Sequence, residues 1–163
     1  MLVLVNCGGP GVKTPAPSPT GETSPTVASD ACHVGDTTYC VLNPSVTPET
    51  IQSTICVAGW TATIRPSASY TSQLKLQQMQ VEGLLGMASD YEEDHRLPLE
   101  LGGAPSDPMN LSPEARIGAP NNSYTKDQAE NLAKAWVCNQ GADLRQVQAD
   151  FALKWLAPWP RYT

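Results

Sequence analysis

The sequence predicts an α+β fold that is mainly helical, with one short β-hairpin. The helical part is indicated by residues 126–140, where apolar side chains recur at the spacing of one helix face. The hairpin is indicated by two short runs, 91–95 and 109–112, which flank a segment with turns at Pro98 and Gly102-Gly103. Because a two-stranded hairpin is marginal alone, we expect helices to cover it.

The first thirty residues have the composition of a tether. Residues 8–30 contain five Pro, four Gly and many Ser and Thr, and their only large apolar side chains are Val12 and Val27. Such a segment cannot bury enough apolar surface to offset the entropy lost on ordering. We therefore expect a disordered Pro/Ser/Thr-rich tether over 1–30. The rest, 31–163, is long enough for one domain with a modest core.

Before the hairpin predicted over 91–112, the sequence predicts four short elements. Residues 32–40 are expected to form a short loop or hairpin. Thr47-Pro48 is typical of a helix start, and this helix would run to about residue 56. Residues 61–65 alternate and are β-branched, which predicts a short strand. Residues 69–81 predict a second helix, whose glutamines indicate a largely solvated surface.

After the hairpin, the chain predicts a loop over 113–124 and two helices. Thr125 can cap the first helix, with Gln128 completing a capping box. Gly141 ends that helix. The apolar residues of 144–155 mark a last helix before Pro158.

The charge balance argues against tight nucleic-acid binding. The formal net charge is −6, and residues 90–94 add a local acidic run. A protein that binds duplex DNA normally shows a basic face, because phosphate neutralisation supplies most of its non-specific affinity. Hydrolysis is not excluded, and a bound divalent cation would offset part of the charge.

Four of the five cysteines form an even set, as disulfides require: Cys32, Cys40, Cys56 and Cys138. They contain no Cys-x-x-Cys pair and are accompanied by only two His, which is not a zinc signature. Of the three pairings that four cysteines allow, we predict Cys32–Cys40, which brackets a turn, and Cys56–Cys138, which joins an early segment to the amphipathic helix. Such bonds indicate an extracellular or cell-surface location.

The fifth cysteine, Cys7, follows Leu4-Val5-Asn6 in a string that loosely resembles a bacterial lipoprotein cleavage site. The six residues before it are fewer than the roughly 7–15 apolar residues of a signal peptide, and they lack a basic start. Either the true start lies upstream, or Cys7 is an ordinary cysteine. The first alternative predicts lipidation at Cys7 and attachment to a membrane through that anchor.

The most informative stretch contains Asp94-His95, then Pro98-Leu99, Gly102-Gly103 and Asn110-Leu111. It resembles the metal finger of the HNH endonuclease superfamily, in its Asp-His…Pro-Leu-x-x-Gly-Gly…Asn-Leu form, over roughly residues 91–127. Further fragments around Cys56, Arg65-Pro66 and Cys138 resemble a small bacterial subset of that superfamily. The resemblance implies a ββα-metal core with added helices.

The resemblance also implies roles for individual residues. In the family the Asp is a metal ligand, the next His is the general base, and the Asn orients that His. Carried over, these residues are Asp94, His95 and Asn110. The family also places a metal ligand just before a Lys that begins the finger's helix. Lys126 matches this Lys, but no His precedes it, and Asn121 or Asn122, of which we take Asn122, would have to substitute.

The implied chemistry is hydrolysis of a phosphodiester. A neutral His can take a proton from water near pH 7. A divalent ion (Mg, Mn or Zn) held by carboxylate and amide oxygens can stabilise the phosphoryl oxygens. Arg96 and Lys126 are the candidate phosphate contacts. We therefore expect a monomeric metal-dependent nuclease without a small-molecule cofactor, acting on nucleic acid, with DNA favoured over RNA.

An alternative stays open. The acidic balance and the missing His favour a catalytically degenerate HNH-like module, which would bind a partner at the surface or serve a structural role. The retained Asp94-His95 pair favours the enzyme.

Overall fold

The structure, a computed structural model, describes residues 31–34, 37–118 and 122–154 of the chain. The tether predicted over 1–30 and the lipidation predicted at Cys7 lie outside these residues. The described residues form an α+β fold, as predicted, with two antiparallel hairpins and four α-helices. No helix among them is long and apolar enough to cross a membrane.

The first hairpin pairs β1 (Ala31–Val34) with β2 (Thr37–Val41), which confirms a hairpin at this place. Cys32 lies opposite Cys40, and the two form a disulfide with Cα atoms 5.0 Å apart. Just after β2, Leu42 makes an isolated bridge to Gly103. This bridge fastens the first hairpin to the loop of the second.

Two predicted elements are wrong. A single 3-10 turn, η1 (Ile51–Ser53), replaces the α-helix expected up to residue 56, because the Thr50 hydroxyl bonds to nearby backbone groups and competes with helical pairing. The strand expected over 61–65 is instead the short helix α1 (Trp60–Ile64). Trp60 packs against the core there, so tertiary packing outweighs the β propensity of its neighbours.

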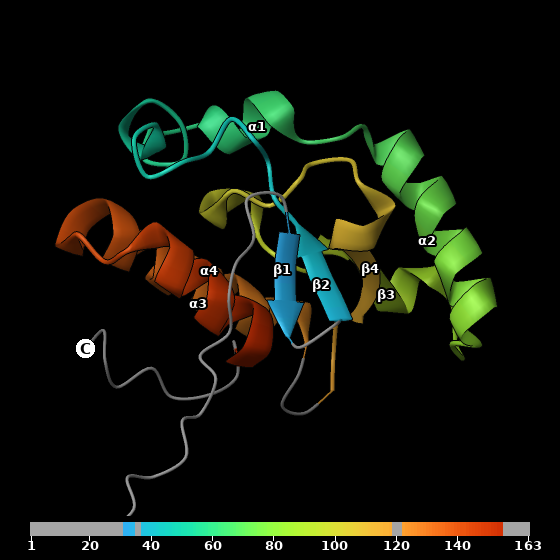
Figure 1. Ribbon diagram of the computed structural model, residues 1–163. Coiled ribbons are helices and arrows are strands. Elements are labelled where there is room, and N and C mark those ends of the chain that lie inside the picture. Colours follow the sequence, from blue (N-terminus) through green and yellow to red (C-terminus); the bar gives the residue numbers. More distant parts are fainter. Residues whose placement is uncertain (1–30, 35–36, 119–121, 155–163) are drawn as a thin grey trace, which may run out of the picture.

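Helix α2 (Ala68–Glu82) confirms the helix predicted over 69–81, but its attachment is polar. Val81, near its C-terminal end, is 86% exposed. Instead, Lys75 Nζ donates to the Tyr91 carbonyl (2.9 Å), and Gln78 Nε2 donates to the Leu111 carbonyl (3.1 Å). Figure 1 shows α2 beside the strands of the second hairpin, whose carbonyls it binds.

The second hairpin pairs β3 (Tyr91–His95) with β4 (Leu111–Ala115), and His95 lies opposite Leu111. The first strand is confirmed at the predicted bounds. The second begins later than the predicted 109–112, because the Asp107 side chain caps a 3-10 turn, η4 (Pro108–Asn110), ahead of it. A further 3-10 turn, η3 (Leu99–Leu101), lies in the connecting loop.

Helices α3 (Ser123–Gln140) and α4 (Leu144–Lys154) complete the described fold and confirm both predicted helices. The N-cap of α3 is Asn122 rather than Thr125, which stands at the third helical position of the capping box. Gly141 ends α3 with a φ of 72°, a conformation that favours glycine. The predicted end of the last helix at Pro158 lies outside the described residues.

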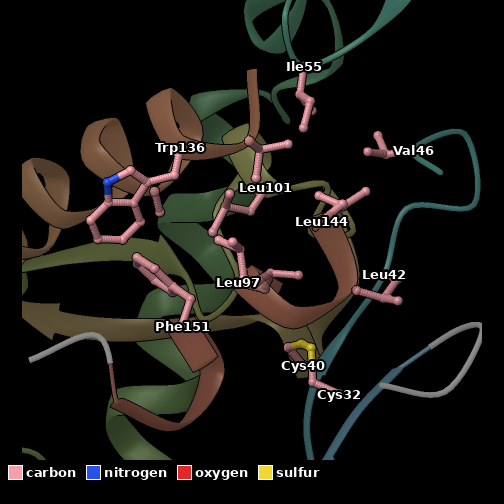
Figure 2. Packing of buried hydrophobic residues seen from close by; sticks show 13 residues of the cluster. Cys32, Cys40, Leu42, Val46, Ile55, Leu97, Leu101, Trp136, Leu144 and Phe151 are labelled. Carbon is pink, nitrogen blue, oxygen red and sulfur yellow. A yellow bond between two sulfur atoms is a disulfide. The ribbon is translucent and has the colours of Figure 1, made fainter. Parts of the chain in front are cut away.

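The core lies between α3, α4 and the loop of the second hairpin. Figure 2 shows Leu97 and Leu101 of that loop packed among Trp136 of α3, Leu144 and Phe151 of α4, and the Cys32–Cys40 disulfide. Cys56 and Cys138 form the second disulfide, with Cα atoms 5.4 Å apart. Both predicted pairings are therefore confirmed, and they indicate an oxidising compartment.

Candidate functional site

Strand β3 sends its last two side chains in different directions, because successive residues of a strand point to opposite faces. The Asp94 carboxylate meets Lys126 of α3. The His95 ring instead lines a cavity of about 250 Å³ between α2 and the second hairpin, called here the His95 cavity. The sequence motif therefore divides into two neighbouring sites, one on each face of the strand.

His95 is held as a neutral imidazole. It is 4% exposed, and its Nε2 lies 2.9 Å from the Pro105 carbonyl oxygen. A carbonyl only accepts, so Nε2 carries the hydrogen and the lone pair is on Nδ1. Burial lowers the pKa of His95 below its usual value, although the Pro105 bond and the charge of Asp94 oppose this shift. The ring can therefore accept a proton near pH 7.

Asn110 fixes the loop that orients His95. Its fully buried amide donates to the Leu97 carbonyl (3.0 Å) and the Ala104 carbonyl (2.9 Å), and it accepts from the Leu97 N–H (3.0 Å). Ala104 precedes Pro105, whose carbonyl receives His95. Asn110 is thus connected to His95 through the backbone of residues 104 and 105.

The His95 cavity is rich in charge. Arg116 is paired with Glu92 (2.9 Å), and Lys75 Nζ is bound to two carbonyl oxygens. Arg65 is exposed, and its guanidinium has no hydrogen bond or ion pair to another described residue. The charged and titratable lining residues are Arg65, Lys75, Glu92, Glu93, His95 and Arg116. Arg65 is therefore the cation most available to an anionic ligand.

Glu93 lies two residues before His95, on the same face of β3. Both of its carboxylate oxygens are buried, and neither has a hydrogen-bond partner among the described residues. Burial raises the pKa of Glu93 to about 7, although the positive charge of Lys75 opposes the shift. The cavity therefore contains a carboxyl group that is partly protonated near neutral pH.

On the other face of β3, Lys126 is 3% exposed and is surrounded by oxygens. Its Nζ donates to Asp94 Oδ2 (2.6 Å), to the His95 carbonyl (2.7 Å) and to Glu130 Oε1 (2.9 Å). Glu114 Oε2 lies 3.7 Å away. We call these side chains, Lys126 with Asp94, Glu114 and Glu130, the Lys126 cluster.

The Lys126 cluster has more negative than positive groups. Burial alone would raise the pKa of Asp94, but the charge and hydrogen bond of Lys126 outweigh it and lower that pKa. Burial raises the pKa values of Glu114 and Glu130 to about 7, against the attraction of Lys126. Burial would lower the pKa of Lys126, yet the carboxylates raise it, so the ammonium stays charged.

The predicted metal ligands do not fit a divalent ion. Asp94 Oδ1 accepts from the His95 N–H (2.7 Å), and its Oδ2 accepts from Lys126. The Asn122 Oδ1 accepts from the Thr125 N–H (3.0 Å), and its Nδ2 donates to the Gly118 carbonyl (2.6 Å). Within the described ranges, no group of three His, Cys, Asp or Glu side chains is placed to hold a metal ion in the protein as it stands, with Lys126 between Asp94, Glu114 and Glu130.

The two predicted phosphate contacts lie away from the His95 cavity. Arg96 and Lys126 line a second cavity of about 240 Å³, together with Glu114 and Tyr39, and it shares no lining residue with the first. The structure thus brings His95 together with Arg65, not with Arg96.

Sequence reasoning missed Arg65, Glu93 and Glu130 as site residues. Arg65 is part of the motif resemblance but received no role. Glu93 could have been found from the two-residue period of a strand, which places it on the face of His95. Glu130 could have been found from its i, i+4 spacing to Lys126.

Comparison with family models, with curated proteins and with solved structures found no match.

Proposed function

We propose that the chain hydrolyses phosphodiester bonds in nucleic acid, with His95 as the general base. The observation that carries this proposal is the buried, neutral His95, fixed through Nε2 and lining a cavity that also contains Arg65. The order of hairpin and helix, β3, β4 and α3, is the order that the HNH resemblance implies. In this reaction the residues of the His95 cavity supply the base and the positive charge.

The chemical step requires a base and a counter-charge. His95 Nδ1 takes a proton from water as the water oxygen attacks phosphorus. The bond from phosphorus to the leaving oxygen breaks, the leaving oxygen takes up a proton from solvent water, and the protonated His95 releases its proton to solvent. Arg65 binds a non-bridging phosphate oxygen, because a guanidinium matches phosphate geometry and always carries its charge. The partly paired Arg116 and Lys75 add positive potential around the phosphate.

The test is hydrolysis of plasmid DNA and of RNA by the purified full chain, with and without chelator. His95→Gln keeps a donor for the Pro105 carbonyl but provides no base, so we expect a loss of about 10²–10⁴-fold. Thermal unfolding of each variant shows that the fold is intact. Hydrolysis that survives His95→Gln would come from another site or a contaminant and would end the proposal.

Two exposed arginines give a matched comparison. Arg65→Ala removes the unpaired cation of the His95 cavity, so activity should fall by about ten- to hundredfold, the value of a charged hydrogen bond. Arg96→Ala changes the other cavity and should have little effect. The opposite ranking would place the phosphate in the cavity of Arg96, as the motif alone predicted.

A second candidate is a binding module without catalysis. The engagement of Asp94 by Lys126 favours it, because the first residue of the motif is then used for structure. If the chain is such a binding module, the wild-type protein hydrolyses neither plasmid DNA nor RNA, with or without chelator. Labelled single-stranded DNA would still bind the full chain, and Arg65→Ala would weaken that binding.

The proposed location is outside the cell or at a bacterial surface. The two disulfides support an oxidising compartment, and the predicted lipid anchor at Cys7 would fix the protein to a membrane. Mass spectrometry of the protein from its natural membrane fraction tests this, because lipidation adds a defined mass to Cys7.

A further inference from the structure

The Lys126 cluster connects three elements at one buried point. Asp94 and the His95 carbonyl belong to β3, Glu114 belongs to β4, and Glu130 shares helix α3 with Lys126. The ammonium group of Lys126 therefore joins both strands of the hairpin to the helix. In a metal finger of this order, such a cross-link would be the task of a bound cation.

We propose that the Lys126 ammonium is the resident cation of this ββα element and replaces a divalent ion beside Asp94. This inference goes beyond the proposed hydrolysis and does not depend on it. It predicts that the fold is independent of divalent ions, and that removing Lys126 creates a cation site among the carboxylates that it leaves behind.

The hydrogen-bond count supports the proposal. An ammonium has three N–H donors, and three oxygens accept from Lys126 at 2.6, 2.7 and 2.9 Å. All donors are therefore satisfied although the group is almost fully buried, as a buried charge requires. Asp94 has both of its oxygens engaged, by Lys126 and by the His95 N–H.

Electrostatic repulsion also argues against a divalent ion beside Asp94 while Lys126 is present. A divalent ion bound to Asp94 Oδ2 would lie next to a charged ammonium that is shielded from water, where like charges repel strongly. Without Lys126, three carboxyl groups would remain around the vacated space. Carboxylate oxygens are the ligands that hard divalent cations prefer, so the same space would then suit such an ion.

The position of Lys126 in the chain makes this arrangement possible. Lys126 stands at the start of α3, one helical turn before Glu130, and its own N–H bonds to the Asn122 carbonyl. The side chain can thus extend from the first turn of the helix to the end of β3. Asn122, the substitute metal ligand, instead serves as the N-cap that begins this turn.

The experiment measures thermal unfolding of the full chain in chelator and in millimolar Mg²⁺, Ca²⁺, Mn²⁺ or Zn²⁺. We expect the wild-type midpoint to stay within about 1 °C across these conditions, since no ion binds selectively to the folded state. Lys126→Ala should unfold roughly 10 °C lower or more, because it leaves buried carboxylates without their counter-charge. At least one divalent ion should then raise its midpoint by several degrees.

Two further variants separate this site from general salt effects. Lys134→Ala removes another lysine of α3, whose pair with Glu100 (3.0 Å) is more exposed, and should show neither the large loss nor the ion response. Adding Asp94→Asn to Lys126→Ala should abolish the ion response, because it removes a ligand of the created site.

Calorimetry on the wild type decides the proposal even if Lys126→Ala does not fold. Divalent-ion binding that is lost on Asp94→Asn would overturn it, and so would a large fall of the wild-type midpoint in chelator. A Lys126→Ala protein as stable as the wild type would also overturn it. A folded Lys126→Ala protein that does not respond to any ion would contradict the predicted cation site.

Discussion

Asn110 forms both hydrogen bonds of the Leu97 backbone: its amide oxygen accepts from the Leu97 N–H and its amide nitrogen donates to the Leu97 carbonyl, each at 3.0 Å. The two residues are buried and are thirteen positions apart in the chain. The Asn110 side chain therefore supplies the hydrogen bonds that a neighbouring strand would otherwise form with the Leu97 backbone. It holds the loop of the second hairpin in place after β3 has ended.

Asn110→Ala should destabilise the protein by roughly 3–5 kcal/mol, because it leaves several buried backbone groups without partners. Urea unfolding at constant pH measures the loss. Asn131→Ala is the matched control, because this amide on α3 makes one exposed bond to the Asp127 carbonyl, and the expected change is within about 0.5 kcal/mol. Equal stability of the two variants would contradict the role given to Asn110.

Gly103 should not tolerate a side chain. A Cβ at this position would collide with the Leu97 carbonyl oxygen and would lie 2.6 Å from Asn110 Nδ2. We expect Gly103→Ala to cost roughly 3 kcal/mol or more, because backbone atoms must move. Gly59→Ala is the informative comparison, since its Cβ would meet no atom within 4 Å and only its φ of 79° opposes the change. A milder effect at Gly103 than at Gly59 would show that the loop can shift.

The disulfide Cys56–Cys138 should contribute more stability than Cys32–Cys40. It closes a loop with a sequence separation of 82, against 8 for the other bond. In the chain-entropy model these loops correspond to about 4–5 and about 2–3 kcal/mol. Paired Cys→Ala variants compared by urea unfolding test the order. A greater loss for the short loop would mean that the buried packing of Cys32 and Cys40 outweighs loop entropy.

Activity should have an acidic limb set by His95. Burial lowers the pKa of His95 from 6.5, and only the neutral ring accepts a proton, so kcat/KM should fall once the pH drops below that lowered pKa. A rate profile between pH 4.5 and 8 measures the limb. If full activity required a pH well above 7, the general base would be a group other than His95.

Elements with strong local signals were predictable from the sequence. The amphipathic helix of Trp136 follows from its period and the two disulfides from spacing and pairing rules, while the strand 91–95 follows from its place in the motif before the turns at Pro98 and Gly102-Gly103. The strand predicted over 61–65 failed, because the packing of Trp60 on the core is a tertiary effect that a local pattern does not contain. Propensity is a weak guide in so short a segment.

The site was only partly predictable for a related reason. The motif identified Asp94, His95 and Asn110, but it could not show which atoms each would meet. The partner of Asp94 lies 32 residues later, and Arg65, from a segment before α2, lines the same cavity as His95. Such long-range contacts depend on how the helices dock on the hairpin.

Stability should fall as the pH rises from about 5 to 8, because of the Lys126 cluster and Glu93. Burial raises the pKa values of Glu93, Glu114 and Glu130 from 4.5 to about 7. Between pH 4.5 and 7 these three glutamates bind more protons in the folded state than in the unfolded state. Their contribution to the free energy of unfolding is therefore complete below pH 4.5 and is lost as the pH rises through 7.

His95 works in the opposite direction, because its lowered pKa makes the folded state bind fewer protons below pH 6.5. Three glutamates outweigh one histidine, so we expect a net loss of stability from pH 5 to 8. Asp94 has a lowered pKa and affects stability only when the pH falls through its own range, below 3.8.

Urea unfolding at pH 5 and pH 8 measures this loss. Glu130→Gln removes one of the titrating groups and should flatten the dependence. Glu82→Gln changes an exposed glutamate of α2 and should affect the slope much less, because its charge adds only a smaller part of the upward shift in the pKa of Glu93. A wild-type protein that is more stable at pH 8 than at pH 5 would mean that Glu114 and Glu130 are ionised beside Lys126 throughout. The ammonium would then hold all three carboxylates in their charged form.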